Sequence, residues 1–446
     1  MRVWFVLGAP MARRFVEPVM AAVAEAGHEV VVAMVTGPAE PFSDVPSARV
    51  HALARDPTDA VAAVRGAEVA RTFASYLALR ARWEPLMRSR WLEYFPAYLG
   101  RVVRLVDRLR LSWSLDNGLS RRLAAGLARS FPTPRPLRDG LADVAPDVVV
   151  LTPMIYPGTR ELDLVADARA RAIPTIGLVL SWDNLTSKAT FLRQPDLLLV
   201  WNEKQRTEAI DWHGFPPARV EALGAPVFDH LFDRVAVPAR GETLLSIGLD
   251  SDVAYVLYGV SSRLGLDVGG EVDIARRLGG ALRDHEATRS KATLVVRPHP
   301  RNAAAFDQDL GANVVVTAAP DFPSTDAARR QLHGLLVHAD AVIGLNTSLF
   351  IEAAIAGTPV VAMSLQGEVS PTQMPSSLTH FDHLRNAGFV HIVPGPSDVA
   401  AVVATIRGSG DSHEDQRRSF VESFVRPGGL AQSAATLVAE RILSFG

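Results

Sequence analysis

The sequence predicts an α/β protein built from two doubly wound domains that face each other across a cleft. Short apolar runs alternate with helix-like segments in both halves of the 446-residue chain, and this alternation is typical of parallel sheets covered by helices. The apolar runs lack a polar residue at every second position, as expected of strands that are buried on both faces. The length itself allows two or three domains.

Each half contains five predicted strands with helices between them. The strands of the first half are Val3–Leu7, Val30–Val35, Asp147–Leu151, Thr175–Leu180 and Leu197–Trp201. The helices of the first half include Arg13–Ala26, Thr159–Ala172 and Lys204–Trp212. The strands of the second half are Ala254–Tyr258, Thr293–Val296, Asn313–Thr317, Ala341–Ile343 and Pro359–Met363. The helices of the second half are Val268–Asp284, Thr325–His338 and Ser348–Ala356.

A linker is predicted at Val235–Glu242, where proline and glycine interrupt the pattern. We therefore expect an N-terminal domain over residues 1–235 and a C-terminal domain over residues 236–446. The closing helix, Leu430–Leu443, can pack on either domain. Crevices beyond the carboxyl ends of parallel strands collect ligands, so the cleft between the domains is the expected site.

Composition and missing motifs exclude several classes of protein. The absence of cysteine rules out disulfides and thiolate metal sites, and it fits a reducing compartment. A net charge of −2 argues against nucleic acid as a partner. We expect a cytoplasmic protein, because the first residues lack the long apolar core of a signal peptide and no stretch approaches 18 apolar residues. Phosphate-loop, zinc-protease, nucleophile-elbow and dinucleotide-binding motifs are all missing.

Residues 71–130 form a basic segment, with twelve arginines, four acidic residues and a net charge of +8. Aromatic residues are interleaved with the arginines: Phe73, Tyr76, Trp83, Trp91, Tyr94, Phe95, Tyr98 and Trp113. Helices of this composition can lie in a membrane interface or bind anionic lipid-linked acceptors. The alternative is a helical insertion whose arginines face water and whose aromatic residues form a core.

Strand Thr293–Val296 leads into the run Arg297-Pro298-His299-Pro300. The two prolines hold the backbone extended and remove two amide donors. His299 then lies at a rigid strand tip, where its imidazole can donate to a phosphate oxygen, and we place Arg297 on the same phosphate-binding side. The alternative role of His299 is to cap a loop.

A second anion-binding feature follows strand Ala341–Ile343. The run Gly344-Leu345-Asn346-Thr347-Ser348 opens a predicted helix, and small hydroxyl residues at a helix start offer amides, hydroxyls and the positive end of the helix dipole to an anion. We predict that Asn346, Thr347 and Ser348 hold a diphosphate. A plain N-cap is the alternative.

Three further side chains and one glutamate extend this predicted phosphate site. Ser261, Ser262 and Arg263 follow strand Ala254–Tyr258 and can add hydroxyls and a guanidinium to the same anion. Glu352 lies about one helical turn beyond Ser348, so its carboxylate can accept both hydroxyls of a ribose. A solvent-exposed glutamate is the alternative reading of Glu352.

In the first half, two strand ends carry candidate acceptor-side residues. Gly8 forms a tight turn after the first strand and is a candidate to contact the acceptor. The alternative is an ordinary glycine at a strand–helix turn. Strand Thr175–Leu180 ends in Ser181-Trp182-Asp183-Asn184-Leu185-Thr186-Ser187-Lys188, and Lys188 is one of only three lysines. We predict that Asp183 is a general base and that Lys188 positions charged groups, with Trp182 and Asn184 on the acceptor side. An Asx-turn at Asp183 and Asn184 is the alternative.

The order of these motifs resembles nucleotide-sugar-dependent glycosyltransferases of the GT-B fold, and more narrowly the CDP-glycerol glycerophosphotransferase-like group with its capsule-building relatives. The resemblance covers roughly residues 145–440. The matching runs are Ser181 to Lys188, Pro195 to Asn202, Gly224-Ala225-Pro226-Val227-Phe228-Asp229, Val260-Ser261-Ser262-Arg263, His299-Pro300 and Thr347-Ser348. Two positions depart from the group: Asp183 stands where it has a histidine, and Leu345-Asn346 where it has Asp-Tyr.

The resemblance implies two Rossmann-like domains and a transferase that moves a sugar, or a polyol phosphate, from a nucleotide-activated donor to a hydroxyl of a cell-surface glycan precursor. We expect single displacement with inversion and no metal or other cofactor, because a helix start and cationic side chains can stabilise the leaving diphosphate. The catalytic residues would be Asp183, His299 and Lys188. Two other functions are open: a non-hydrolysing nucleotide-sugar 2-epimerase, which shares the fold, and a non-catalytic glycan-binding protein.

Overall fold

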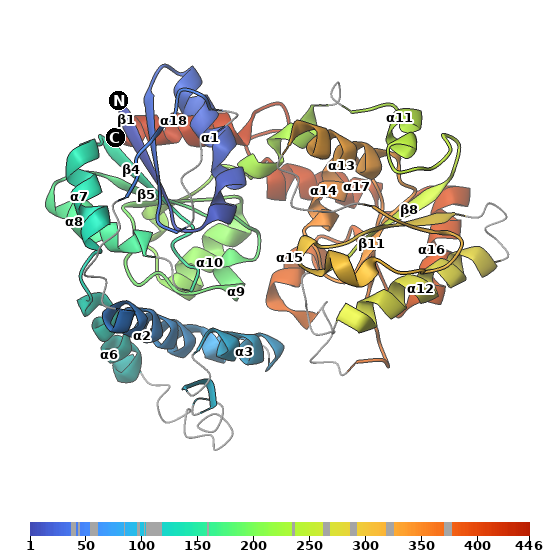
Figure 1. Cartoon of the computed structure of the whole chain (residues 1–446), viewed down its shortest axis with the longest axis horizontal. Coiled ribbons are helices and arrows are strands. Elements are labelled where there is room, and N and C mark those ends of the chain that lie inside the picture. Colours follow the sequence, from blue (N-terminus) through green and yellow to red (C-terminus); the bar gives the residue numbers. More distant parts are fainter. Residues whose placement is uncertain are drawn as a thin grey trace. The chain divides into compact units, whose positions relative to one another are not determined.

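The computed structural model describes residues 1–36, 42, 45–53, 61–83, 85–95, 99–101, 103, 118–157, 160–233, 237–261, 268–285, 292–317, 325–369 and 377–446. The chain forms two compact units (Figure 1). Unit 1 contains Met1–Asp229 together with Phe424–Gly446, and unit 2 contains His230–Ser423. Each unit has a parallel sheet and its own apolar core. The predicted fold class, an α/β protein with two Rossmann-like domains, is confirmed.

Unit 1 is built on a seven-stranded sheet in the order β3-β2-β1-β4-β5-β6-β7. Its strands are β1 (Arg2–Leu7), β2 (Glu29–Met34), β3 (Arg49–Val50), β4 (Val148–Thr152), β5 (Thr175–Leu178), β6 (Leu197–Val200) and β7 (Val220–Ala222). The edge strands β3 and β7 are the two that the apolar pattern does not predict. They have two and three residues, too few to show a period.

The helices of unit 1 cover both faces of this sheet. They include α1 (Arg13–Glu25), α2 (Val61–Leu79), α3 (Pro85–Trp91), α6 (Gly118–Ser130), α7 (Arg135–Val144), α8 (Leu164–Ala170), α9 (Asn184–Ser187), α10 (Glu203–His213) and α18 (Ala434–Phe445). The predicted helix 159–172 is shorter than expected, because a 3₁₀ turn at Glu161–Asp163 precedes α8. The register pairs Leu7 with both Met34 and Thr152, so the carboxyl ends of neighbouring strands lie side by side.

Unit 2 has a six-stranded sheet in the order β10-β9-β8-β11-β12-β13. Its strands are β8 (Tyr255–Gly259), β9 (Thr293–Arg297), β10 (Val314–Val316), β11 (Val342–Gly344), β12 (Val360–Met363) and β13 (Val390–Val393). Its helices include α11 (Arg240–Leu245), α12 (Val268–Asp284), α13 (Asp326–His338), α14 (Leu349–Ala356), α15 (Asp382–Arg385), α16 (Pro396–Ser409) and α17 (Glu414–Phe420). Strand β13 is not predicted from the sequence, because His391 interrupts its short apolar run.

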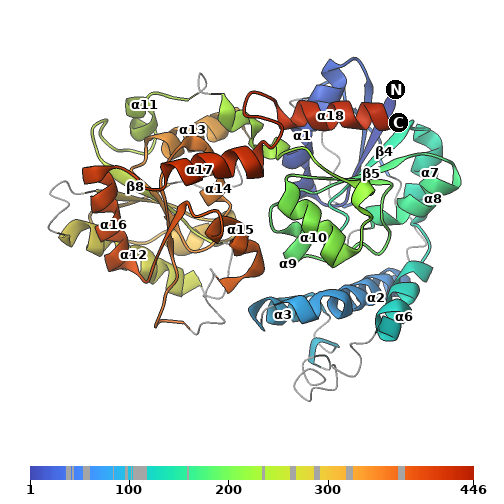
Figure 2. The same ribbon diagram turned by 180° about the vertical axis from the view of Figure 1, so that it is seen from behind.

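The last helix belongs to unit 1, where α18 packs against α1, as both Figure 1 and Figure 2 show. Asp229 holds the returning chain. Its Oδ1 accepts from Arg426 Nη2 at 2.6 Å and from the Ala434 amide at 3.2 Å. Its Oδ2 accepts from the Ala435 amide at 2.8 Å and from Ser433 Oγ at 2.9 Å. The aspartate of the Gly-Ala-Pro-Val-Phe-Asp run thus fixes the start of α18.

No helix in the described part of the chain combines the length and the hydropathy needed to cross a bilayer.

Candidate functional site

Unit 2 gathers the predicted phosphate-binding loops at one edge of its sheet. Strands β9, β8 and β11 are neighbours, so the loops that carry His299, Ser261 and Asn346–Ser348 leave the sheet side by side. We call this group the unit 2 edge. Two glycines allow α14 to lie close to this edge: a Cβ atom on Gly259 would lie 2.7 Å from Leu349 Cδ2, and one on Gly344 would lie 3.2 Å from Phe350 Cε1. A larger residue at Gly259 would force the Leu349 side chain to shift.

The start of α14 presents donors in the way an anion site requires. Ser348 is the N-cap residue and makes no side-chain capping bond. Thr347 Oγ1 accepts from the Leu349 amide at 3.3 Å. Among the residues that the structure describes, the amides of Thr347 and Ser348 donate to no acceptor. These two amides and the helix dipole can therefore bind phosphate oxygens.

Arg297 and Glu352 place opposite charges beside this helix start. Glu352 is the one residue of α14 that is not buried. Burial lowers the pKa of Arg297, and the negative charge of Glu352 acts in the opposite direction. The guanidinium at the end of β9 therefore lies within electrostatic reach of the carboxylate on α14. The Arg297 cation suits a phosphate, and the Glu352 carboxylate can accept hydrogen bonds from the hydroxyls of an attached ribose.

Ser261 takes a different role from the predicted one. Its amide donates to Glu271 Oε1 at 2.7 Å, and its hydroxyl donates to Glu271 Oε2 at 2.8 Å. Burial raises the pKa of Glu271, while the two Ser261 bonds act to lower it. The Ser261 hydroxyl is thus committed inward and anchors the loop after β8, rather than pointing a donor at a phosphate. Ser262 and Arg263 lie outside the described residues.

Two residues that the sequence analysis missed tie the loops of the unit 2 edge together. Asn302, only 4% exposed, donates from Nδ2 to the Ser261 carbonyl at 3.1 Å, and its amide donates to the His299 carbonyl at 2.8 Å. The Asn346 side chain lies 3.1 Å from Nε2 of the buried His380. His299 itself is half-buried at the strand tip. Only the position of Asn302 just after the His-Pro run could have suggested its role.

Unit 1 gathers its candidate residues at the carboxyl ends of β1, β4 and β5, which are neighbours in the sheet. We call this group the unit 1 edge. Asn184 organises the loop after β5, because its Oδ1 accepts from the amides of Leu180 and Ser181 at 3.2 and 3.0 Å. The Asn184 side chain therefore has a structural role, because it stabilises the turn that follows β5. Trp182 is 5% exposed and packs inward.

Asp183 and Lys188 form an ion pair at the unit 1 edge. Lys188 Nζ lies 3.4 Å from Asp183 Oδ2, which also accepts from Ser187 Oγ at 2.7 Å. Burial by itself lowers the pKa of Lys188, but the opposing electrostatic interactions with Asp183 and Tyr156 outweigh it and the net pKa is raised. Lys188 therefore stays protonated. The ammonium also lies 5.3 Å from the centre of the Tyr156 ring.

Tyr156 and Glu161 are further polar residues of the unit 1 edge that the sequence analysis missed. Tyr156 follows β4, and burial raises the pKa of its hydroxyl. Glu161 is fully buried and its Oε1 accepts from the Met154 amide at 2.6 Å. A Cβ atom on Gly8 would overlap the Glu161 carboxylate. Gly8 is thus required for packing against Glu161. The loop after β4 begins Pro153-Met154-Ile155-Tyr156-Pro157, and this largely apolar run offered little signal for a polar site.

The aromatic residues of the basic segment support the loop that carries Asp183. Trp83 Nε1 donates to the Thr186 carbonyl at 2.7 Å, and Trp91 Nε1 donates to the Ser187 carbonyl at 3.0 Å. The two indoles stack with ring centres 4.8 Å apart. These two tryptophans, with Tyr76 and Phe95, are buried. These four aromatic residues therefore form a core, as the alternative interpretation predicted, and do not lie in a membrane interface. Tyr98 and Trp113 lie outside the described residues.

His213 supports the same loop from α10. Its Nε2 lies 2.7 Å from the Leu185 carbonyl oxygen, a distance at which the neutral ring donates. Burial lowers the pKa of His213 to about 4, against a weaker opposing effect of the Leu185 bond. A charged imidazole is therefore excluded from this position near neutral pH.

We expect the stability of unit 1 to fall as the pH drops from about 6.5 to about 4. The unfolded chain protonates this histidine near pH 6.5, while the folded chain does so only near pH 4. The free energy of unfolding is therefore not reduced by His213 above about pH 6.5. It falls by about 3 kcal/mol between pH 6.5 and pH 4. His213→Gln keeps an N–H donor for Leu185 but does not titrate, so its stability should lack this slope.

Urea unfolding at several pH values, followed by tryptophan fluorescence, measures this effect. All seven tryptophans belong to the sequence of unit 1, so the signal reports that unit. Equal pH slopes for the wild type and the glutamine variant would show that His213 does not carry the effect.

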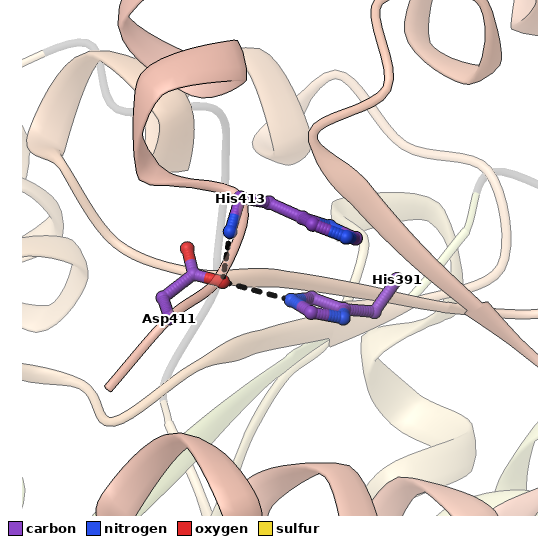
Figure 3. A group of neighbouring side chains, drawn as sticks. All are labelled: His391, Asp411 and His413. Carbon is purple, nitrogen blue, oxygen red and sulfur yellow. Dashed lines mark hydrogen bonds and ion pairs between the residues drawn. The ribbon is translucent and has the colours of Figure 1, made fainter. Parts of the chain in front are cut away.

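Figure 3 shows the group of side chains that, within the described residues, could hold a metal ion: His391, Asp411 and His413. His391 Nε2 lies 2.8 Å from Asp411 Oδ1, which also accepts from the His413 amide at 3.1 Å. The imidazole rings stack 3.9 Å apart with planes 12° from parallel, so their lone pairs do not meet at one point as tetrahedral ligands do. Arg417 pairs with the other oxygen of Asp411. The group joins β13 to α17 as a polar contact.

Solved structures share this fold over the whole chain. The UDP-GlcNAc 2-epimerase from Neisseria meningitidis, bound to UDP-GlcNAc, is 14% identical with a TM-score of 0.58, and all of each chain is covered. The glycosyltransferase of kitacinnamycin is 12% identical with a TM-score of 0.53, covering 99% of this chain and 98% of the other. The calicheamicin glycosyltransferase is 14% identical with a TM-score of 0.51, covering 100% and 98%.

These likenesses show a fold of the GT-B type, with two Rossmann-like units. No protein-family model matches the chain, and no curated protein matches it significantly.

Proposed function

We propose that the chain is a nucleotide-sugar-dependent glycosyltransferase that acts on a hydroxyl of a cell-surface glycan or lipid-linked acceptor. The observation that carries this proposal is the junction of three strand ends at the unit 2 edge. There the start of α14 offers two amides, and Arg297 and Glu352 lie within electrostatic reach of each other. A cation, free amides and a carboxylate are the groups that recognise a diphosphate attached to a ribose.

The proposed reaction divides its work between the two units. The unit 2 edge holds the leaving diphosphate through Thr347, Ser348, Arg297 and His299, and Glu352 accepts from the ribose hydroxyls. In unit 1, Asp183 takes the proton of the acceptor hydroxyl while the acceptor oxygen bonds to the anomeric carbon. The bond from that carbon to the diphosphate oxygen breaks, which gives single displacement with inversion. Lys188 keeps Asp183 charged and oriented.

The donor base is proposed from the solved neighbours. One is described with UDP-GlcNAc bound and another, a Staphylococcus aureus protein, as a complex with UDP, so a uridine nucleotide is the first candidate. The resemblance to the CDP-glycerol group makes a cytidine donor, and transfer of a polyol phosphate, the second. An acceptor linked to a lipid would place the reaction at the inner face of a membrane.

A thermal-shift panel of UDP, CDP, GDP, CMP and dTDP tests nucleotide binding. The matching nucleotide should raise the melting temperature by mass action, by the equivalent of about 2.7 kcal/mol at a hundredfold excess over its Kd. Glu352→Gln should weaken its binding about 10- to 100-fold, because a charged hydrogen-bond acceptor to the ribose is lost. Glu414→Gln on the exposed start of α17 is the matched control and should bind as the wild type does.

Two outcomes of these measurements favour other functions. If none of the five nucleotides shifts the melting temperature, the chain is a non-catalytic protein with a transferase fold. If a nucleotide sugar is converted to its C2 epimer without any acceptor, the chain is a nucleotide-sugar 2-epimerase. The epimerases among the solved neighbours favour this second candidate. Product analysis with and without acceptor separates it from a transferase.

A further inference from the structure

We propose that helix α6 docks the chain on an anionic membrane surface. Three leucines of this helix are among the most exposed large apolar residues of the structure: Leu119, Leu123 and Leu127 are 67%, 65% and 59% exposed. They lie four residues apart, which aligns them in one stripe along the helix. A contiguous stripe of this kind needs an explanation that single exposed leucines do not.

The opposite face of α6 is already occupied. Helix α6 packs against α2, and both ribbon views show the two helices side by side (Figures 1 and 2). Ala128, which is 2% exposed, lies on the packed side. The helix therefore packs on unit 1 through the side that carries Ala128, and the exposed leucine stripe lies on the other side.

Positive charge flanks the leucine stripe. Arg122 and Arg129 are exposed, and at 100° per residue both fall on the same side of the stripe. Helix α6 contains no acidic residue, and it ends the basic segment of residues 71–130, whose net charge is +8. An apolar stripe bordered by arginines is the pattern of a helix that lies in the plane of an anionic membrane surface.

The size of the stripe argues against a second copy of the chain as the partner. Leu119 to Leu127 spans eight residues, or about 12 Å of helix. A stable interface buries about 800 Å² on each partner, which three leucines on two turns do not provide. A bilayer surface requires no complementary protein shape, so a short stripe with nearby arginines is sufficient.

Co-sedimentation with vesicles tests the proposal on the full-length protein. We expect the wild type to bind vesicles of phosphatidylglycerol and phosphatidylcholine mixed equally, and to bind pure phosphatidylcholine weakly. Replacing all three leucines with glutamine (L119Q/L123Q/L127Q) should reduce binding to the mixed vesicles about 100-fold or more, because each buried leucine adds roughly a factor of ten. Replacing both arginines with glutamine (R122Q/R129Q) should reduce it about 25-fold, and only on anionic vesicles.

The control is Leu245→Gln in α11 of unit 2, because Leu245 is equally exposed at 68%. This variant should bind as the wild type does. All substitutions are at exposed positions, and tryptophan fluorescence confirms that unit 1 remains folded. Equal binding of neutral and anionic vesicles, no vesicle binding by the wild type, or full binding by the triple leucine variant would each overturn the proposal. A loss of self-association in the triple variant, without a change in lipid binding, would assign the stripe to a second copy.

The membrane proposal and the proposed enzymatic function fail separately. Vesicle binding is measured without nucleotide, and the nucleotide panel is measured without lipid. A triple leucine variant that keeps its nucleotide-dependent thermal shift shows that docking and donor binding use different surfaces.

Discussion

Replacing Asp229 with alanine will lower the free energy of unfolding of unit 1 by about 3–5 kcal/mol, the usual cost of removing one partner of a largely buried ion pair. Arg426 is 8% exposed and would keep its charge with no carboxylate at 2.6 Å. The amides of Ala434 and Ala435 would also lose their acceptor. Urea unfolding followed by tryptophan fluorescence measures the loss, because the tryptophans all belong to unit 1.

The matched control for this variant removes the ion pair between Glu221 of β7 and Arg441, which also attaches α18 to unit 1. Glu221 accepts from Arg441 Nε at 2.7 Å and from Nη2 at 2.8 Å, but both side chains are about one-third exposed. Glu221→Ala should cost about 1 kcal/mol or less, since solvent screens an exposed pair. If the Asp229 and Glu221 variants lose equal stability, the attachment of α18 does not depend on Asp229.

Replacing Asp183 with asparagine will lower kcat about 10²- to 10⁴-fold, the range that a general base contributes. Asparagine keeps the shape of the side chain and can still accept from Ser187, but it cannot take a proton. The nucleotide is proposed to bind in unit 2, so its Kd should not change. The measurement is release of nucleoside diphosphate from the donor identified by the binding panel, together with nucleotide affinity.

Ser187→Ala separates proton transfer from loop structure. It removes the 2.7 Å hydrogen bond to Asp183 Oδ2 and leaves the carboxylate and its Lys188 pair in place. The expected loss is about tenfold or less. Near wild-type turnover in Asp183→Asn would show that Asp183 is not the base and serves only to neutralise Lys188.

The fold could be predicted from the sequence because the central strands of both sheets are continuous apolar runs. Strands such as β1 and β12 are buried on both faces, and such a run has few other interpretations. The edge strands β3 and β7 could not be predicted, because they pair on one side only and are too short to require apolar residues. The return of α18 to unit 1 depends on contacts of Asp229 with residues about 200 positions later, which local patterns do not encode.

The candidate site could be predicted in part. Polar residues after strands mark a sheet edge, and strand order then brings His299, Ser261 and Thr347 to the same edge of unit 2. The partner of each side chain could not be predicted. The Ser261 hydroxyl is taken by Glu271, ten residues later on α12, and no spacing rule distinguishes that partner from a phosphate. The approach of Asp183 to the unit 2 edge stays a prediction.

The division of the chain into units determines the order in which those units can fold during synthesis. Residues 230–423 of unit 2 are continuous, whereas unit 1 needs both Met1–Asp229 and Phe424–Gly446. On the ribosome, the first 229 residues emerge early but must wait for the final residues before α1 acquires its neighbour α18. Unit 2 can therefore complete its fold while the older part of the chain is still unfinished, which reverses the usual N-to-C order of domain folding.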